Sequence, residues 1–450
     1  MHNGEPADKP QPLAACVDDE VDAASPVAAA LTRTSTIGSL WKHYFAGVNA
    51  LLVFVPLGLV AGLLQWHPAF VSAFNFLGII PLSAMVSDTS DRLADSQGSL
   101  AGALINATFG NAVELIVGIL AIRYGQVGLA QSMMIGSILS DILCMLGVCL
   151  IVTAGPWTTR NLNSAVVDAL SSLMTITAAT LVLPTALYSS FRGTADIHDK
   201  ILVFSRATAV VLLLVYCVFI YFQMWSHQCI FSSPDDHNYH PALETNTTVH
   251  KTQAQRVDSG QLQDDEPSLP REQHVQVDTV DGDHQAVDQQ PEEAETTSLY
   301  ALAGILVSAA AVIMWCTHMV IKSLDGTVEV LHISKTFFAT MILPMASNAP
   351  EFSSVIAASK NRRINFAVGV IAGSILQIAL FVTPSLVLFG WFAREEMTLS
   401  FEVSQTCIMF LAVLIVNQVL QEGAYTYLHG VMLLVMYATI ALAYFVQPDH

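Results

Sequence analysis

Long apolar runs, each of the length that crosses a bilayer as a helix, follow one another through most of this chain. A transmembrane helix needs about 20 predominantly apolar residues. Of the 450 residues, 53% are hydrophobic and only 12% are charged. A soluble domain carries about 25% charged residues. The sequence therefore predicts an all-α polytopic membrane protein.

Eleven apolar runs are expected to form transmembrane helices. They cover residues 44–65, 69–87, 98–122, 127–153, 163–187, 202–225, 299–322, 333–358, 364–391, 400–419 and 425–446. The polar segments between them predict four parts of the chain. These are a disordered N-terminal tail (1–40), a first membrane half with six helices (41–226), an acidic disordered loop (227–297) and a second membrane half with five helices (298–450).

The negative charge of the chain is concentrated outside the apolar runs. Of the net charge of −19, the tail at 1–40 carries −4 and the loop at 227–297 carries −12. Segments with so much charge and so few apolar residues cannot bury enough surface to fold. We favour the interpretation of the loop as a solvated linker. The alternatives are a regulatory segment and a cation sensor. The seven cysteines are scattered without a CxxC pair, so neither a disulfide framework nor a zinc site is expected.

Two short motifs recur at the same spacing in the two halves. Asn-Ala-Val-Glu at 111–114 matches Asn-Ala-Pro-Glu at 348–351, and Gly-Ser-Ile-Leu occurs at 136–139 and again at 373–376. Both pairs are 237 residues apart, which indicates a duplicated unit. Five predicted helices take the chain from one glutamate to the other. Because five is odd, the copies run in opposite directions, as in the inverted repeats of secondary transporters. We expect five plus five helices, with one extra helix at the N-terminus.

Each copy places one ionisable carboxylate, Glu114 or Glu351, at the depth of the membrane. Such a group is costly there and is a functional-site candidate by default. Pro350 removes a backbone donor, which predicts a broken helix in the second copy. The predicted ligands of a cation share oxygen donors. They are Glu114, Glu351, Asn111, Asn348, Ser137, Asp141, Ser374 and Gln377.

These ligand types favour a hard cation over zinc or copper. Calcium takes six to eight oxygen ligands, and manganese accepts similar ones. Two carboxylates match one divalent ion in charge, and protons can take its place when it leaves. Competition between a metal ion and protons for the same oxygens is the simplest form of antiport. The alternative for each glutamate is a structural ion pair.

Three further polar residues lie within apolar runs. Asp141 has no counterpart in the second copy, where Ile378 stands 237 residues later. We interpret Asp141 as a ligand or proton carrier, with a paired or helix-end structural role as the alternative. His318 and Lys322 are four residues apart and share one helix face. A position at the membrane edge is favoured over a part in proton traffic.

Several stretches of this chain resemble the cation/proton exchanger family, specifically the vacuolar calcium/proton exchangers of fungi and plants. The resembling stretches are LINATFGNAVELIV at 104–117, GSILS at 136–140, SRATAVVLLLVY at 205–216, ISKTF at 333–337, GSILQIALFVTPSLVLFG at 373–390 and VLIVN at 413–417. The resemblance covers about residues 40–445. The family's signature glutamates fall on Glu114 and Glu351, and its signature asparagines on Asn111 and Asn348.

The resemblance implies an eleven-helix protein of the vacuolar membrane that moves cytosolic Ca²⁺ inward against outward proton flow. Cations and protons are then the substrates and the bilayer is the surrounding partner. No cofactor and no nucleic acid are expected, and the oligomeric state stays open. The basic cluster at 360–363 favours a cytosolic end for the eighth helix. That orientation puts the N-terminus and the acidic loop in the cytosol.

The chain also departs from the family pattern. Its second signature reads Ser-Asn-Ala-Pro-Glu-Phe, where the family usually has Gly-Asn-Ala-Ala-Glu-His, so Phe352 replaces a histidine. Asp141 stands where asparagine is usual, and His318 and Lys322 stand where Glu and Asp are usual. These changes leave open a manganese or broad cation/proton exchanger. A membrane sensor or scaffold acting through the acidic loop is a further alternative. An intramembrane enzyme would need a motif such as HExxH, which is absent.

Overall fold

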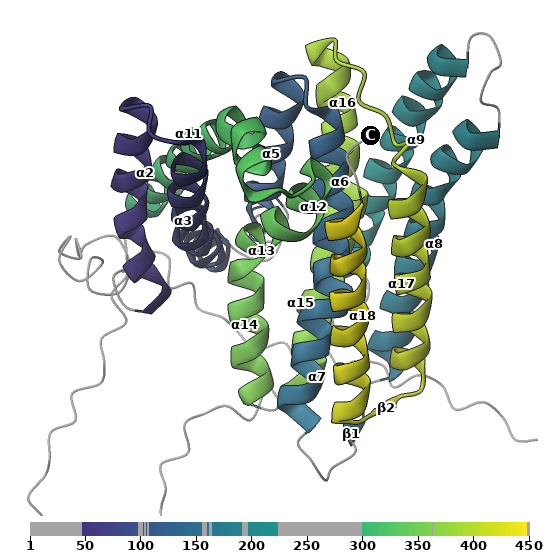
Figure 1. The fold of residues 1–450 in the computed structure, drawn as a ribbon. Coiled ribbons are helices and arrows are strands. Elements are labelled where there is room, and N and C mark those ends of the chain that lie inside the picture. The colour runs from purple at the N-terminus through teal and green to yellow at the C-terminus, as the bar shows by residue number, and fades with distance from the viewer. Residues whose placement is uncertain are drawn as a thin grey trace, which may run out of the picture. The chain divides into compact units, whose positions relative to one another are not determined.

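The described part of the chain is almost entirely helical in the computed structural model (Figure 1). The structure describes residues 47–97, 102, 105, 108–154, 160–161, 164–190, 197–223, 299–361 and 363–447. The predicted disordered tail at 1–40 and the acidic loop at 227–297 lie outside the described residues. The division of the chain into four parts therefore stays a prediction.

In the first half, the helices are η1 (Gly47–Val53), α2 (Phe54–Leu63), α3 (Pro68–Gln97), α5 (Ala112–Arg123), α6 (Val127–Leu139), η2 (Ser140–Met145), α7 (Leu146–Ala154), α8 (Ser164–Ser190) and α9 (Ile197–Tyr221). In the second half, they are α11 (Leu299–Leu331), α12 (Lys335–Phe337), η4 (Phe338–Ile342), α13 (Leu343–Ser347), α14 (Ala349–Lys360), α15 (Ile364–Gln377), η5 (Ile378–Val382), α16 (Thr383–Ala393), α17 (Val403–Gln421) and α18 (Tyr427–Val446). Segments η2, η4 and η5 are π-helical turns inside longer helices. Two short strands, β1 (Arg160–Asn161) and β2 (Ala424–Tyr425), pair antiparallel.

Each of the eleven predicted runs contains helix in the described residues. Over that part of the chain, eight helices are long and apolar enough to cross a membrane. The predicted class, an all-α polytopic membrane protein, is confirmed. The count of eleven spans and the five-plus-five division stay predictions.

Two helices are longer than their apolar runs. Helix α3 continues to Gln97, and α11 continues to Leu331. Polar residues extend both helices; in α3 the Arg92 Nε donates to Asp88 Oδ2 at 3.1 Å, four residues back. An apolar run marks the stretch suited to lipid, whereas intrahelical hydrogen bonds and such pairs can carry the helix further.

The secondary structure repeats at the same spacing as the duplicated motifs. Helices α5 and α14 both have 12 residues, and their first residues are 237 apart. A π-helical turn follows the Gly-Ser-Ile-Leu motif in each copy, as η2 and η5. In Figure 1, α6 continues downward into α7, whereas α15 continues upward into α16. These two long helices therefore run in opposite directions.

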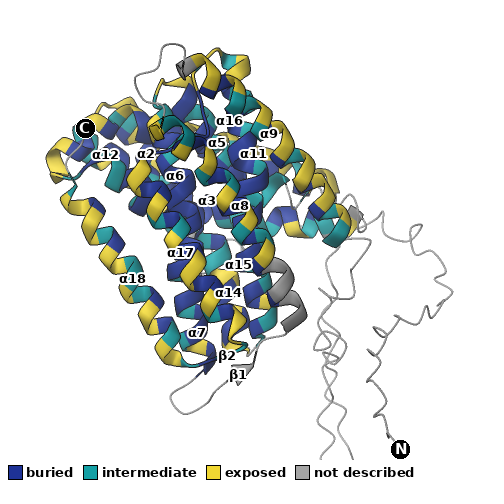
Figure 2. Cartoon of the chain, turned by 90° about the vertical axis from the view of Figure 1, so that its right-hand side faces the viewer, coloured by how far each residue is buried: buried dark blue, intermediate teal, exposed yellow. Residues whose placement is uncertain are grey.

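Helices from the two halves pack against each other throughout the described core. Helix α3 packs along α11, α7 along α18 and α8 along α17. The span formed by α6, η2 and α7 is 78% buried, whereas the α18 span is 22% buried. Figure 2 shows this contrast as dark blue along α6 and mixed yellow along α18. The motif-bearing helix is therefore central, and α18 lies at the periphery.

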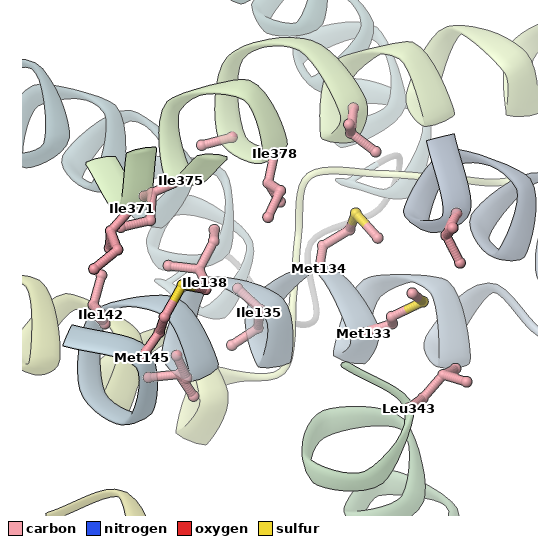
Figure 3. Packing of buried hydrophobic residues seen from close by; sticks show 14 of the residues in the cluster. Met133, Met134, Ile135, Ile138, Ile142, Met145, Leu343, Ile371, Ile375 and Ile378 are labelled. Carbon is pink, nitrogen blue, oxygen red and sulfur yellow. The ribbon is translucent and has the colours of Figure 1, made fainter. Parts of the chain in front are cut away.

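Apolar side chains pack between the α6–η2 helix and α15. In Figure 3, Ile138, Ile142 and Met145 face Ile371 and Ile375 of α15. Met133 and Met134 of α6 are fully buried in the same cluster. These methionines act as packing residues, in agreement with their apolar surroundings.

Candidate cation site

Both signature asparagines lie at breaks in their helices. Helix α5 begins directly after Asn111, and α14 begins directly after Asn348. Pro350 occupies the first turn of α14, where the backbone N–H that it lacks would have no partner within the helix. The break predicted for the second copy is confirmed. The first copy has an equivalent break that the sequence analysis did not predict, because no proline marks it.

The breaks place both signature glutamates in the first turn of a helix. Glu114 is the third residue of α5, and Glu351 is the third residue of α14. Backbone N–H groups at a helix start lack intrahelical partners, and the positive end of the helix dipole lies there. Both features stabilise a negative charge. Glu114 is 1% exposed, and Glu351 is half-buried.

Asp141 connects the two halves within the core. It lies in the π-helical turn η2 and is completely buried. Asn348 Nδ2 donates to Asp141 Oδ1 at 2.6 Å, and Ser374 Oγ donates to Asp141 Oδ2 at 2.9 Å. The structure thus shows the paired role that was the alternative interpretation of Asp141. Its role toward a cation belongs to the proposal below.

A second hydrogen bond joins the halves, this time from the asparagine of the first half to a residue of the second half. Asn111 Nδ2 donates to Gln377 Oε1 at 2.7 Å, while Asn348 Nδ2 also approaches the backbone oxygen of Ser137 at 3.4 Å. Each signature asparagine therefore bonds to the π-turn region of the other half. The amide nitrogens of both asparagines are occupied by these contacts.

The three buried acids lie close enough to interact. Glu351 interacts electrostatically with both Glu114 and Asp141, and Asp141 interacts with Glu114. The hydroxyl of Ser347 lies beside the Glu114 carboxyl group and also donates to Asn348 Oδ1 at 3.3 Å. The sequence analysis missed Ser347 as a site residue. Its signal is the serine at the position before the signature asparagine, where the first copy has glycine.

Four oxygen atoms of this cluster are buried without a hydrogen-bond partner. They are Asn111 Oδ1, Glu114 Oε1, Ser137 Oγ and Glu351 Oε2. An unsatisfied buried polar atom costs about 1–3 kcal/mol. Four such atoms belong to the residues predicted to coordinate a cation. They indicate a site for a group that is coordinated by oxygen atoms.

Acidic side chains alone do not complete the coordination of a metal ion at this site. Over the part of the chain that the structure describes, no three His, Cys, Asp or Glu side chains converge tightly enough to hold a metal ion by themselves. A cation at this position would therefore also need amide and hydroxyl oxygens. The cluster offers those oxygens at Asn111 and Ser137.

Three other residues singled out in the sequence are His318, Lys322 and Phe352. His318 Nδ1 hydrogen-bonds the hydroxyl of Tyr124, just past the end of α5, with the ring centroids 5.3 Å apart. Lys322, one turn further along α11, is exposed. Phe352 packs against the hydrophobic core. An edge position for His318 and Lys322 stays a prediction.

Comparisons with known proteins identify the family. The sodium/calcium exchanger protein family matches residues 67–225 and 301–446. The chain is 33% identical over 410 residues to the vacuolar calcium ion transporter of Schizosaccharomyces pombe, which covers 91% of this chain and 86% of that protein. This chain belongs to the sodium/calcium exchanger protein family. It is also 29% identical over 398 residues to a Ca²⁺/H⁺ antiporter of Synechocystis sp., covering 88% of this chain and 96% of that protein.

Solved structures share the fold of this family member. The structure of native YfkE aligns with a TM-score of 0.67 at 21% identity, covering 89% of this chain and 100% of that one. The structure of an H⁺/Ca²⁺ exchanger CAX aligns with a TM-score of 0.56 at 13% identity, covering 90% of this chain and 93% of that one. The family match and the relatives above confirm the family predicted from the motifs, and the solved structures show its fold.

Proposed function

We propose that this protein is a Ca²⁺/H⁺ antiporter of the vacuolar membrane and not an enzyme. It moves cytosolic Ca²⁺ into the vacuole in exchange for H⁺ by alternating access. The names of its relatives support this substrate pair and this membrane. The observation that carries the proposal is the group of four unpartnered buried oxygens, two of which belong to the three interacting carboxyl groups. This group lies where the two halves bond to each other.

Charge balance supplies the coupling between Ca²⁺ and H⁺. Glu114 and Glu351 together neutralise one divalent ion. Buried carboxylates without a partner cost several kcal/mol in a membrane, so protons replace the ion when it leaves. When the charges of the two glutamates alone are counted, a site occupied by Ca²⁺ or by two protons is neutral and can change its exposure at low cost, whereas an empty site with both glutamates charged cannot. The protein therefore exchanges the two substrates and does not leak either one.

The neighbouring residues hold the ligands in place. Gln377 engages the amide nitrogen of Asn111, which leaves Asn111 Oδ1 available to the cation. Asp141, itself fixed by Ser374, engages the amide nitrogen of Asn348. We assign Glu114, Glu351, Asn111 and Ser137 to direct contact with the cation. Asn348, Asp141, Ser374 and Gln377 complete the oxygen lining and position these ligands.

Proton-driven uptake of ⁴⁵Ca²⁺ into vesicles tests the exchange mechanism. We expect Glu114→Gln and Glu351→Gln each to lower uptake to background, because a neutral amide neither balances the ion nor carries the proton. Glu329→Gln is the matched control, since Glu329 is exposed near the end of α11. Undiminished uptake by both site variants would reject the mechanism.

A second candidate is a manganese or broad cation/proton exchanger. It is favoured by Asp141, a third buried acid that interacts with both glutamates, at a position where similar exchangers usually have asparagine. Dissipation of a proton gradient by Ca²⁺, Mn²⁺, Mg²⁺, Na⁺ and K⁺, compared side by side, decides between the candidates. A response to Mn²⁺ at least as strong as the response to Ca²⁺ would favour the second one.

We place the N-terminus and the acidic loop in the cytosol. The loop contains the sequon Asn246-Thr247-Thr248, which stays unglycosylated in that orientation. Deleting residues 235–295 leaves cation flux intact if the loop is a linker. Loss of the protein's cellular role with flux retained would instead favour a sensor or scaffold.

A further inference from the structure

A polar cavity lies outside the glutamate site. Its volume is about 460 Å³, and its walls come from the α5–α6 loop, the start of α6, α12 with η4, the start of α17 and the residue after α18. None of the eight predicted ligands lines it. Elements of both halves therefore build a cavity that the proposed exchange site does not use.

Glu402 supplies a fixed negative charge to this cavity. Its Oε1 accepts from Ser404 Oγ at 2.6 Å and from Gln447 Nε2 at 2.8 Å, and its Oε2 accepts from Gln405 Nε2 at 3.0 Å. Lys335 also lines the cavity, but its Nζ lies 2.6 Å from Asp325 Oδ1. Since Asp325 compensates the lysine charge, the carboxylate of Glu402 leaves the cavity negative.

Gln405 lines the cavity and has an oxygen atom without a hydrogen-bond partner. Its side chain is 1% exposed, and its Nε2 donates both to Glu402 and to Ser132 Oγ at 3.0 Å. These two acceptors fix the orientation of the amide. Its Oε1 is buried and unpartnered. A buried side-chain oxygen without a donor carries an energetic cost, so this one is available to a bound group.

The size and chemistry of the cavity fit a partly hydrated divalent cation. At about 30 Å³ for each water molecule, the space corresponds to roughly fifteen waters. Calcium takes six to eight oxygen ligands, of which water can supply several. The carboxylate of Glu402, the amide oxygen of Gln405 and the hydroxyl of Ser132 are hard oxygen donors. The lining holds neither sulfur nor imidazole, the ligands that zinc and copper prefer.

The cavity lies on the helix that leads to the exchange site. Ser132 and Asp141 are nine residues apart on the α6–η2 helix, which corresponds to about 14 Å at 1.5 Å per residue. Between them, Gly136 lies directly against the backbone of Thr340 in η4, where a Cβ atom would collide with the carbonyl group. Backbone contact between α6 and η4 therefore lies between Ser132 and Asp141 along this helix.

We propose that the cavity at Glu402 binds a partly hydrated divalent cation and is a second cation site on one face of the protein. The inference rests on the proposed function only for the identity of that ion as the transported one. With residues 360–363 in the cytosol, Glu402 lies one crossing away, at the vacuolar face. Separation of α6 and η4 opens a path of about 14 Å along α6 from the carboxylates to Glu402 and Gln405, where the ion is held before it leaves the protein.

Binding of Mn²⁺ to the purified full chain, followed by electron paramagnetic resonance, tests the second site directly. Glu114→Gln and Glu351→Gln together remove the exchange site. We expect one weak Mn²⁺ site to remain and to be displaced by Ca²⁺. Adding Glu402→Gln should weaken this binding about tenfold, because one charge at contact distance is lost. Glu395→Gln, in the α16–α17 loop and outside the cavity lining, is the matched control. Mn²⁺ binding that is absent, or unaffected by Glu402→Gln, would overturn the proposal.

Exchange measured separately from each face gives a second readout. Glu402→Gln should raise the half-saturating Ca²⁺ concentration about three- to tenfold at one face only, with the maximal rate retained. An equal change at both faces would contradict the proposal, because it would place the effect at the exchange site or on folding. If the wild-type chain exchanges no Ca²⁺, the proposed function fails, while Mn²⁺ binding still decides the cavity.

Discussion

Asp141 uses both oxygens of its carboxylate to join residues of the other half. Asn348 can only donate through its amide nitrogen, whereas the hydroxyl of Ser374 can either donate or accept. An asparagine at position 141 could therefore accept from Asn348 and donate to Ser374. The hydrogen bonds of the core do not require a charge at this position. The charge is then a matter of function and not of folding.

Two substitutions at position 141 separate these roles. We expect Asp141→Asn to change the melting temperature of the detergent-purified protein little, because both partners stay satisfied. Asp141→Leu removes the acceptor of the Ser374 hydroxyl and leaves the Asn348 amide only its 3.4 Å contact with Ser137, which costs about 1–3 kcal/mol for each group. Thermal unfolding of the two variants beside wild type is the measurement. Equal destabilisation by both would show that the charge itself supports the fold.

The π-helical turns are the elements that shape the site. Such turns are rare and are frequently found at functional positions. Here η2 carries Asp141, and η5 follows Gln377 directly. The third turn, η4, presents the backbone of Thr340 to Gly136 of α6. Close approach of two helices at a glycine is how membrane helices bring backbones together.

The close contact between α6 and η4 predicts that alanine substitutions at two glycines of α6 change the stability of the protein very differently. Gly136→Ala places a methyl group against the Thr340 carbonyl, and such overpacking costs about 1–3 kcal/mol. Gly128→Ala meets open space in the same helix and should be neutral or stabilising by up to about 1 kcal/mol. Thermal unfolding checks both variants. A Gly136→Ala protein as stable as Gly128→Ala would mean that α6 and η4 are not held in contact.

At this scale, the sequence predicts helices well and their interruptions poorly. Apolar length locates the spans, and Pro350 locates the break before α14. The break at Asn111 and the π-turns escape prediction, because a single extra residue in a turn leaves hydropathy almost unchanged. The predicted ligands are brought together, but their pairing is not readable from spacing. Asn348 and Asp141 are 207 residues apart, and only tertiary packing decides that they bond.

At the scale of the whole molecule, the two halves pack against each other along several helices. Helices α3, α7 and α8 of the first half each pack along a helix of the second half. The antiparallel pairing of Arg160 with Tyr425 adds a backbone link between distant loops. Alternating access therefore requires helices of both halves to slide on one another. The α6–η4 contact is the natural place for such a movement to open one face.

The inverted repeat predicts opposite exposure of two equivalent helix ends. Arg123 ends α5 and Lys360 ends α14, exactly one repeat spacing of 237 residues later, and both side chains are exposed. In a chain without its seven native cysteines, we introduce Arg123→Cys and Lys360→Cys separately. An impermeant maleimide should label one of them in intact vesicles and the other only after permeabilisation. Glu422→Cys, at the end of α17, is the control and should label together with Lys360→Cys, since two crossings separate them. Labelling of Arg123→Cys and Lys360→Cys from the same face would exclude an inverted repeat and, with it, a site shared symmetrically between the two halves.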